Sequence, residues 1–354
     1  MSARNVTRSP RRDRGFTLVE LMVSMVISLL IALAALGSAR VFMAAQRQSV
    51  GVGTASGNAV TAMASVKHEA EQAALGFFLN GALPCQTFNL SSGTKVMADN
   101  APLSPLRISN SSQSRAQLDL MYADSLASSA PAFLLGDTSS SAAQAELASF
   151  LPVQPGQAVM LAPLGDAGLP CTVKTAVRVD APQPSRGPVL YFDASGLHNQ
   201  ATFTPVTYSS SSALSWLGAM NWSRFAVDGA NNLVMSRPMD DTSAVVARNV
   251  MGFQVQYGVS DGITPTLSGW EYGEGAWATM NTTLLSRVRA LRIGLVLRSE
   301  QPEKPDSLGN CSATVTPPVL LDRSLALSGN WQCYRYRTST VVVPLRNILM
   351  GSSS

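Results

Sequence analysis

The residue types that most often perform chemistry are sparse in this 354-residue chain. It has only two histidines, His68 and His198, and they lie far apart in the sequence. His68-Glu69 begins like a zinc-protease motif, but the second histidine is missing because residue 72 is Gln. The sequence has no Gly-x-Ser-x-Gly elbow, no phosphate-binding loop and no metal-ligand cluster. These absences argue against an enzyme, and we expect no cofactor.

One acidic turn invites comparison with a calcium loop. Asp228 is followed by Gly229 and by Asn231 and Asn232, all of which carry oxygen ligands or allow a tight turn. The spacing is not that of an EF-hand, and Asp-Gly turns are common in hairpins. We therefore predict a hairpin turn here and no metal.

The four cysteines, Cys85, Cys171, Cys311 and Cys333, form no Cys-x-x-Cys motif. An even number behind a membrane-directing N-terminus favours disulfides in an oxidising compartment over four unrelated buried thiols. Four cysteines allow three pairings. We favour Cys311–Cys333, which would close a loop that runs into the last strand, and Cys85–Cys171 would then be the second bridge.

The positive charge is confined to the N-terminus. The net charge is +4, and residues 1–15 alone contribute five arginines and one aspartate. From Phe16 onward, basic and acidic residues balance. The charge is therefore typical of a leader and not of a nucleic-acid-binding face, and we expect no nucleic-acid partner.

The run 16–39 is predominantly apolar and contains one charged residue, Glu20. A helix of this length crosses about 30 Å of hydrocarbon. The arginines before it favour a cytoplasmic N-terminus, which puts the rest of the chain in the periplasm. A cleaved secretory signal and a plain signal anchor are alternatives, but neither explains a carboxylate five residues into the apolar run.

The residues from Arg14 to Val23 read Arg-Gly-Phe-Thr-Leu-Val-Glu-Leu-Met-Val. This segment closely resembles the class III leader of type IV prepilins and type II secretion pseudopilins. The resemblance implies that a prepilin peptidase cuts between Gly15 and Phe16 and methylates the new amine of Phe16. Glu20 occupies the position of the family's characteristic carboxylate.

The position of Glu20 also has a physical meaning. A carboxylate inside a membrane span is costly and usually functional. Cleavage after Gly15 would create a positive amine on Phe16, one helical turn away. We expect Glu20 to pair with such an amine, and the family resemblance favours the amine of a neighbouring subunit. The alternative is a carboxylate that reaches the membrane surface without a partner.

The stretch from Val41 to about Phe78 lacks proline and has apolar residues at helical spacing. We predict one long helix over residues 16–80, with a possible bend at Gly51, Gly53 and Gly57. Its apolar stripe would include Val52, Ala55, Ala59, Met63, Val66, Ala70, Ala73, Ala74 and Phe77. Polar residues, including Glu69 and Glu71, would fill the other faces.

Residues 81–354 are predicted to form a mainly antiparallel β head with loops rich in Ser, Pro and Gly. A hairpin is expected between 225–227 and 233–235, around Asp228-Gly229. Alternating residues mark four strands: Val173, Thr175, Val177 and Val179; Phe253, Val255, Tyr257 and Val259; Leu291, Ile293, Leu295 and Leu297; and Tyr334, Tyr336, Thr338, Thr340 and Val342.

Motifs in the second half are similar to those of the PilW family of minor pilins. They are Trp222-Ser-Arg-Phe225, the run from Val250 to Gly258, the run from Arg287 to Arg292, and the ending from Tyr334 to Asn347. The resemblance implies a pilin-like α+β fold with a leader (1–15), a long helix (16–80, membrane-spanning over 16–39) and a head (81–354).

The same resemblance implies a structural role. The chain would be a minor subunit that helps to start a type IV pilus. Its partners would be the prepilin peptidase, the major pilin, other minor pilins, the assembly platform and the inner membrane. A type II secretion pseudopilin is a close alternative, and a membrane-anchored periplasmic adhesin or binding protein is a more distant one.

The size of the head suggests where such a subunit belongs. A head of about 270 residues has a radius of gyration of roughly 19 Å, against about 14 Å for ~120 residues. A bulky head is hard to repeat at every helical position of a filament. We therefore expect a rare subunit at or near the tip.

Overall fold

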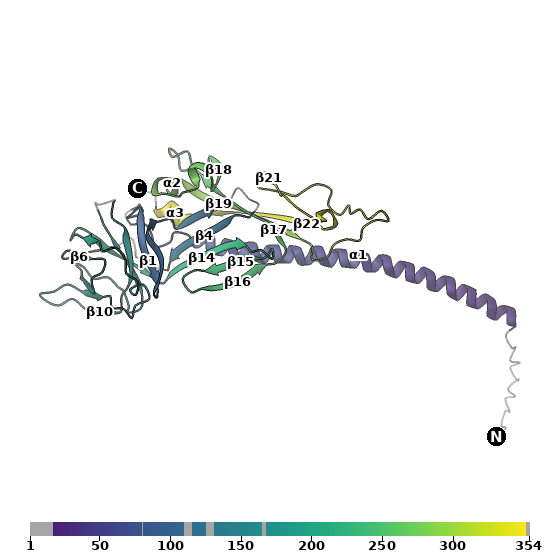
Figure 1. The fold of residues 1–354 in the computed structure, drawn as a ribbon, viewed down its shortest axis with the longest axis horizontal. Helices are drawn as coiled ribbons and strands as arrows, with labels where there is room; N and C mark the ends of the chain where they lie inside the picture. Colours follow the sequence, from purple (N-terminus) through teal and green to yellow (C-terminus); the bar gives the residue numbers. More distant parts are fainter. Residues whose placement is uncertain (1–16, 80, 110–114, 125–130, 165–167, 352–354) are drawn as a thin grey trace, which may run out of the picture. The chain divides into compact units, whose positions relative to one another are not determined.

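The computed structural model describes residues 17–79, 81–109, 115–124, 131–164 and 168–351. The chain forms two compact units, Met1–Gly53 and Thr54–Ser354. One helix, α1 (Leu18–Gln72), is continuous through both units, and nearly all of the remaining regular structure is β. This is the predicted α+β, pilin-like arrangement (Figure 1).

Within the first unit, α1 is apolar over Leu18–Ala39 apart from Glu20 and a few serines. These 22 residues have a mean hydropathy of 2.5, which is long and apolar enough to cross a membrane. Their side chains are exposed, as expected for residues whose solvent is lipid. The helix also passes through Gly51, Gly53 and Gly57 without a break in its assignment.

The second unit begins with the last turns of α1, which pack on the head. Ala59, Ala62, Val66 and Ala70 are at most 1% exposed and form one stripe of the helix. Small side chains on this stripe allow close approach of the β sheets. The predicted apolar stripe is therefore confirmed from Ala59 to Ala70, whereas Val52 and Ala55 lie where side chains are not described. The last three residues of the predicted stripe are also buried, but they follow the end of the helix: Ala73, Ala74 and Phe77.

The helix ends earlier than the expected residue 80. After Gln72 the chain turns, and Ala74 adopts a left-handed conformation with φ of 64°. Its N–H donates to Met121 O at 2.8 Å, and Ala123 N–H donates to Leu75 O at 2.9 Å. These bonds to a strand of the head replace the bonds that would continue the helix.

Three larger sheets make up most of the head, and they are antiparallel except where β1 pairs with β9. The six-stranded sheet has the order β2 (Lys95–Pro102), β1 (Thr87–Ser92), β9 (Cys171–Thr175), β8 (Ala158–Ala162), β13 (Ala213–Gly218), β5 (Ala132–Phe133). The five-stranded sheet has the order β16 (Thr242–Ala247), β15 (Leu233–Arg237), β14 (Met220–Val227), β4 (Gln117–Ala123), β3 (Leu106–Ser109). The four-stranded sheet has the order β18 (Gly269–Tyr272), β17 (Val250–Val259), β19 (Val288–Arg298), β22 (Tyr336–Pro344).

Short elements complete the head. The small sheets are β10 (Arg178–Asp180), β11 (Val189–Tyr191) and β7 (Gln144–Glu146); β12 (Thr207–Tyr208) and β6 (Thr138–Ser139); and β20 (Val319–Leu320) and β21 (Arg323–Ser324). The short helices are η2 (Gly275–Trp277), α2 (Thr282–Leu285), η3 (Trp331–Cys333) and α3 (Arg346–Gly351).

The apolar interior has three parts. The largest cluster joins the buried stripe of α1 to the five- and four-stranded sheets and to part of the six-stranded sheet. A second cluster lies within residues 132–216. A third, with Val296, Leu320, Leu321 and Leu325, lies where β20 and β21 cover the outer side of the four-stranded sheet.

Most of the predicted strands are present, with two differences. The hairpin around Asp228 joins β14 to β15, with Val227 opposite Leu233. The single strand expected over 173–179 is wrong, because β9 ends at Thr175 and the chain changes sheets where Val177 N–H donates to Tyr191 O. In β22, the face that was predicted from Tyr334 to Val342 is the exposed one, and Val343 on the other face is buried.

Candidate assembly site

Glu20 lies in the first turn of α1 and forms a reciprocal cap with Thr17. The Glu20 carboxylate accepts hydrogen bonds from the N–H and the Oγ1 of Thr17, both at 3.0 Å. Thr17 Oγ1 in turn accepts the N–H of Glu20 at 3.3 Å. This arrangement is a capping box, which satisfies donors at the helix N-terminus. Gly15 and Phe16, the residues predicted to flank the cleavage site, lie outside the described residues.

The geometry gives Glu20 two uses. Within one chain, its carboxylate helps to start α1. Its side chain is also exposed, so it is accessible to a second chain. The helix N-terminus favours negative charge at this position.

At the other end of α1, Glu69 attaches the helix to the head. Its carboxylate accepts hydrogen bonds from Ser223 Oγ at 2.7 Å and Tyr122 Oη at 3.0 Å, and Arg237 lies 4.0 Å away. Burial, together with the charge of Glu69, raises the pKa of Tyr122 to about 12. The prediction that Glu69 lies on a polar outer face is wrong, since the residue is only 6% exposed.

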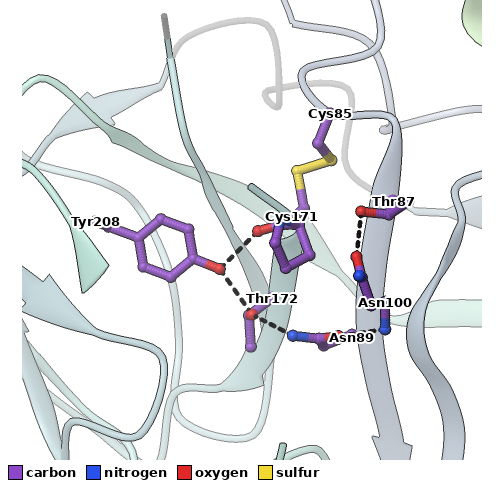
Figure 2. Close-up of a disulfide and its surroundings, with 8 residues drawn as sticks. Cys85, Thr87, Asn89, Asn100, Cys171, Thr172 and Tyr208 are labelled. Atoms are coloured by element: carbon purple, nitrogen blue, oxygen red, sulfur yellow. Dashed lines mark hydrogen bonds between the residues drawn. A yellow bond between two sulfur atoms is a disulfide. The ribbon is translucent and has the colours of Figure 1, made fainter. Parts of the chain in front are cut away.

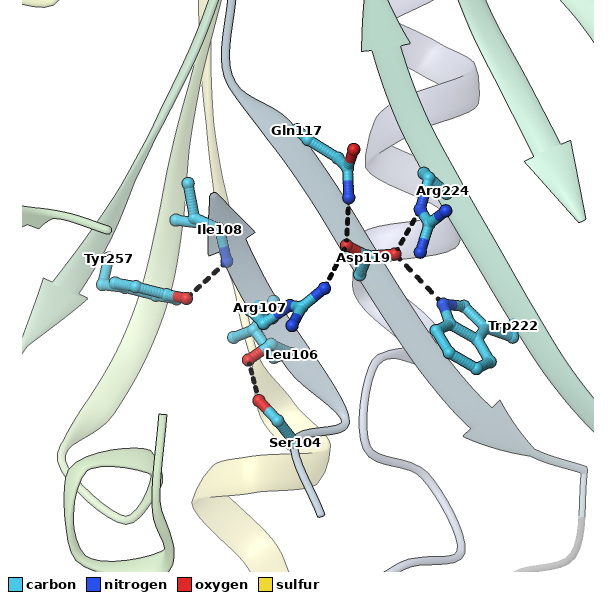
Figure 3. A network of polar contacts seen from close by, with 9 residues as sticks. All are labelled: Ser104, Leu106, Arg107, Ile108, Gln117, Asp119, Trp222, Arg224 and Tyr257. Carbon is cyan, nitrogen blue, oxygen red and sulfur yellow. Dashed lines mark hydrogen bonds and ion pairs between the residues drawn. The ribbon is translucent and has the colours of Figure 1, made fainter. Parts of the chain in front are cut away.

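The outer side of the five-stranded sheet carries a second polar network, centred on Asp119 (Figure 3). Its buried carboxylate accepts hydrogen bonds from Arg224 Nε at 2.7 Å, Gln117 Nε2 at 2.8 Å and Trp222 Nε1 at 3.2 Å. Arg107 Nη2 lies 3.5 Å from it. A buried charge is tolerated only with such partners, so this network fixes the register of β3, β4 and β14.

A buried tyrosine ties this sheet to the four-stranded one. Ile108 N–H in β3 donates to Tyr257 Oη in β17 at 2.6 Å (Figure 3). Burial raises the pKa of Tyr257. The head is therefore held together by buried polar contacts between its sheets as well as by its apolar core.

Both disulfides join the pairs that the sequence analysis favoured, Cys85–Cys171 and Cys311–Cys333. Beside the first, Tyr208 Oη donates to Pro170 O at 2.7 Å and lies 2.8 Å from Thr172 Oγ1, which accepts a hydrogen bond from Asn89 Nδ2 (Figure 2). The second bridge closes the segment that leads from β19 to β22.

Of the remaining candidates for chemistry, Asp228 and His198 make structural hydrogen bonds. The Asp228 carboxylate accepts hydrogen bonds from the backbone N–H groups of Asn232 and Ala230. These bonds lower the pKa of Asp228, and the bond from Asn232 has the largest effect. His68 is exposed on α1. His198 is 5% exposed, and its Nδ1 donates to Ser91 O at 2.5 Å.

Sequence reasoning missed Glu69, Asp119 and Asn347 as contact residues. Asn347 Nδ2 donates to the Glu71 and Ala73 carbonyls at 3.1 and 3.4 Å, which docks α3 on the end of α1. Glu69 carried a usable signal, because it lies three residues after Val66 and one before Ala70, inside the buried stripe. Asp119 carried one too, since it interrupts a run of apolar residues in β4.

The long apolar helix, its capped carboxylate and the β head together define a prepilin-type protein. Residues 10–36 match the family model for the prokaryotic N-terminal methylation motif. Residues 197–347 match the model described as Type IV Pilus-assembly protein W. Comparisons with curated proteins and with solved structures returned no match. The chain therefore combines an N-terminal methylation motif with a PilW domain, and PilW is a structural family of type IV pilus-assembly proteins and not a family of enzymes.

Proposed function

We propose that this chain is a minor pilin that a prepilin peptidase cleaves between Gly15 and Phe16, and that the same enzyme methylates the Phe16 amine. The observation that carries the proposal is the combination of the methylation motif with a capped carboxylate at Glu20. The mature chain would be held in the inner membrane by Leu18–Ala39, with the head in the periplasm, before it enters a pilus.

In this proposal Glu20 has its main role during assembly. Removal of the leader leaves a positive amine on Phe16, directly before Thr17. The Glu20 carboxylate then exchanges its contacts with Thr17 for the Phe16 amine of a neighbouring subunit. A charge-assisted bond of this kind is favoured over a neutral one, and more so in lipid than in water.

The experiment compares Glu20→Ala with Thr17→Ala in the full chain. Both variants lose half of the capping box, so both weaken the start of α1 by about 1 kcal/mol. Only Glu20→Ala removes the carboxylate. We expect normal levels of both variants in the membrane but a loss from purified pili for Glu20→Ala alone. Equal incorporation of the two variants would contradict this role.

Processing has its own test. Intact-mass and N-terminal peptide analysis of the membrane-bound protein should find a chain that begins with N-methylated Phe16. A mature chain that begins at Met1 or Arg40 would rule out the proposed cleavage.

The place in the filament follows from the size of the head. The second unit, Thr54–Ser354, contains three sheets of four to six strands and three apolar clusters, which is a large head to repeat along a shaft. We therefore place this subunit at or near the tip, together with other minor pilins above the major pilin and the assembly platform. Immunogold labelling of sheared pili with quantitative mass spectrometry tests this, and even labelling along the shaft would contradict it.

A further inference from the structure

The strand β22 lies at the edge of the four-stranded sheet, and β19 is the one strand among the described residues that pairs with it. It pairs with β19 over nine consecutive residues, from Tyr336 opposite Arg298 to Pro344 opposite Ala290, with no shift of register. Its far end is held by α3, through the bonds from Asn347 to the end of α1. The edge is therefore long, regular and fixed in place.

Two hydrogen bonds, one just before and one just after β22 in the sequence, show which backbone groups of the strand face outward. Leu345 N–H donates to Arg289 O at 3.0 Å, and Ser299 N–H donates to Arg335 O at 2.8 Å. In an antiparallel pair, bonded residues alternate with residues whose backbone groups point away from the partner strand. The odd-numbered residues therefore bond to β19. The residues whose backbone groups face outward are Tyr336, Thr338, Thr340, Val342 and, at the end of the strand, Pro344, which has no N–H.

The other long edges of the head carry features that discourage strand pairing. The edge strand β2 has two register shifts against β1 and is bounded by Lys95 and Pro102. The edge strand β16 has a register shift against β15. Bulges, lysines and prolines are the usual protection of exposed edges. Among the described strands, β22 is the longest edge, and between Arg337 and Pro344 it has neither a charge nor a proline.

The surface of β22 also suits an added strand. Thr338 and Thr340 are exposed, Val342 is 49% exposed, and Val341 is only partly buried against the core. Threonine and valine have high β propensity, and their half-covered side chains would gain contacts from a neighbouring strand.

We infer that the outer edge of β22 pairs with an extended segment from the head of a different pilin subunit. This inference rests on the proposed function, which surrounds the head with other pilins. Edge pairing recognises backbone groups more than side chains, which suits contact between subunits of unlike sequence. If two β22 strands paired with each other in antiparallel fashion, they would form a closed two-fold dimer. Such a dimer would occupy the edge of β22 without extending a filament, so we favour a different subunit as the partner.

The first test uses Thr340→Pro in the full chain. Proline at this outward-facing position removes an N–H that β19 does not use, so the head's own ladder stays intact. The loss of one intermolecular hydrogen bond corresponds to about fivefold weaker pairing, and the proline ring adds a clash. We expect at least fivefold less of this variant in sheared pili, whereas Thr340→Ala, which keeps the N–H, should be incorporated like the wild type.

Folding is checked in the same cells through the membrane level and the two disulfides of each variant. Thr338→Pro is the second variant at an outward-facing position and should behave like Thr340→Pro. Wild-type incorporation of both proline variants would overturn the inference. An equal loss with Thr340→Ala would also overturn it, because a side-chain contact would then be responsible.

The second test needs no proline. A photo-crosslinking amino acid at Thr340 of the full chain should form a covalent product with another pilin subunit, identified by mass spectrometry. The same group at Ile263, which is 91% exposed on a loop, is the control and should give at least fivefold less of that product. A product with a second copy of this chain, or none with a pilin, would overturn the inference. If wild-type chain is itself missing from pili, the proposed function fails instead.

Discussion

The Glu69 carboxylate and the Ser223 hydroxyl, 154 positions apart in the sequence, form a buried 2.7 Å hydrogen bond. Glu69 is on α1 and Ser223 is in the middle of β14, so this bond joins the helix to the head. Tyr122 donates to the same carboxylate from β4. Three elements thus meet at one carboxylate, whose position fixes how the last turns of α1 sit on the five-stranded sheet.

Glu69→Ala should destabilise the head by about 2–3 kcal/mol. The substitution leaves the buried Ser223 hydroxyl and the partly buried Tyr122 hydroxyl without their acceptor, and an unsatisfied buried polar group costs about 1–3 kcal/mol. The free energy of unfolding is measured by chemical denaturation of the detergent-solubilised full chain, followed by tryptophan fluorescence.

Glu71→Ala is the matched control, two residues away on the same helix. Glu71 pairs with Lys67 at 3.7 Å, but the Lys67 and Glu71 side chains are 48% and 43% exposed. Exposed pairs at this spacing contribute only about 0.3–0.5 kcal/mol. Losses of similar size for the two variants would show that Glu69 is not an anchor.

The two disulfides should be reduced in a fixed order. Cys85 and Cys171 are 3% and 0% exposed, whereas Cys311 is partly exposed. A thiolate reductant must reach a sulfur atom, so Cys311–Cys333 should open first under native conditions. Stepwise alkylation and peptide mapping during reduction follow the order, and earlier release of Cys85 and Cys171 would contradict the prediction.

The stabilisation that each bridge contributes should differ too. In the chain-entropy model, Cys85–Cys171, with a sequence separation of 86, contributes about 4 kcal/mol, and Cys311–Cys333, with a separation of 22, about 3 kcal/mol. Double Cys→Ser variants of each pair, compared by denaturation, check this ranking.

The sequence predicted the parts of this fold that depend on local patterns. Short stretches of consecutive residues were enough to predict three features: the apolar run after Arg14, the helical stripe from Ala59 and the Asp228 hairpin. The end of α1 could not be predicted in this way. It is determined by Met121 and Ala123, whose backbone groups bond to the chain after Gln72 from a distant part of the sequence.

The residues of the candidate site likewise differ in whether local sequence could predict their roles. Glu20 was found from its immediate neighbours, because a carboxylate is conspicuous in an apolar run. Glu69 was misassigned because helix periodicity alone sorts residues by polarity, whereas the structure buries this one beside three donors from distant strands. The edge position of β22 could not be predicted from the sequence either, because it depends on the order of the strands in the folded sheet.

The stability of the head should fall as the pH drops below about 6.5, because of His198. In the folded chain, burial lowers the pKa of His198 below its ordinary value of 6.5. The unfolded chain therefore takes up a proton first, and stability that is present above pH 6.5 is lost as the pH falls below it.

Denaturation at about pH 7.5 and about pH 5.5, on either side of the ordinary histidine pKa, measures this effect. His198→Asn should lose part of the difference between the two pH values, although it also loses the bond to Ser91. His68→Gln is the control, because His68 is exposed on α1, and it should keep the wild-type difference. An unchanged pH dependence in His198→Asn would contradict the assignment.

Gly294 in β19 should not tolerate even an alanine. A Cβ at this position would lie 2.5 Å from Leu320 Cδ1 and 3.1 Å from Leu321 Cγ. These leucines belong to the β20–β21 hairpin, which Arg323 fixes through bonds of 2.8 and 3.0 Å to the Glu274 carboxylate. The Leu320 side chain must turn away or the hairpin must move outward to accept the methyl group, and such overpacking typically costs about 1–3 kcal/mol.

The matched control is Gly229→Ala, because a Cβ at Gly229 would meet nothing within 4 Å. We expect a loss of about 1–3 kcal/mol for Gly294→Ala and a change below about 0.5 kcal/mol for the control, as is usual for surface substitutions. Hydrogen exchange should locate the change: in Gly294→Ala, the amides of residues 319–325 should exchange faster, while those of β17 stay protected. Unchanged exchange in the hairpin, with equal stability of the two variants, would mean that β20 and β21 do not pack tightly on the sheet.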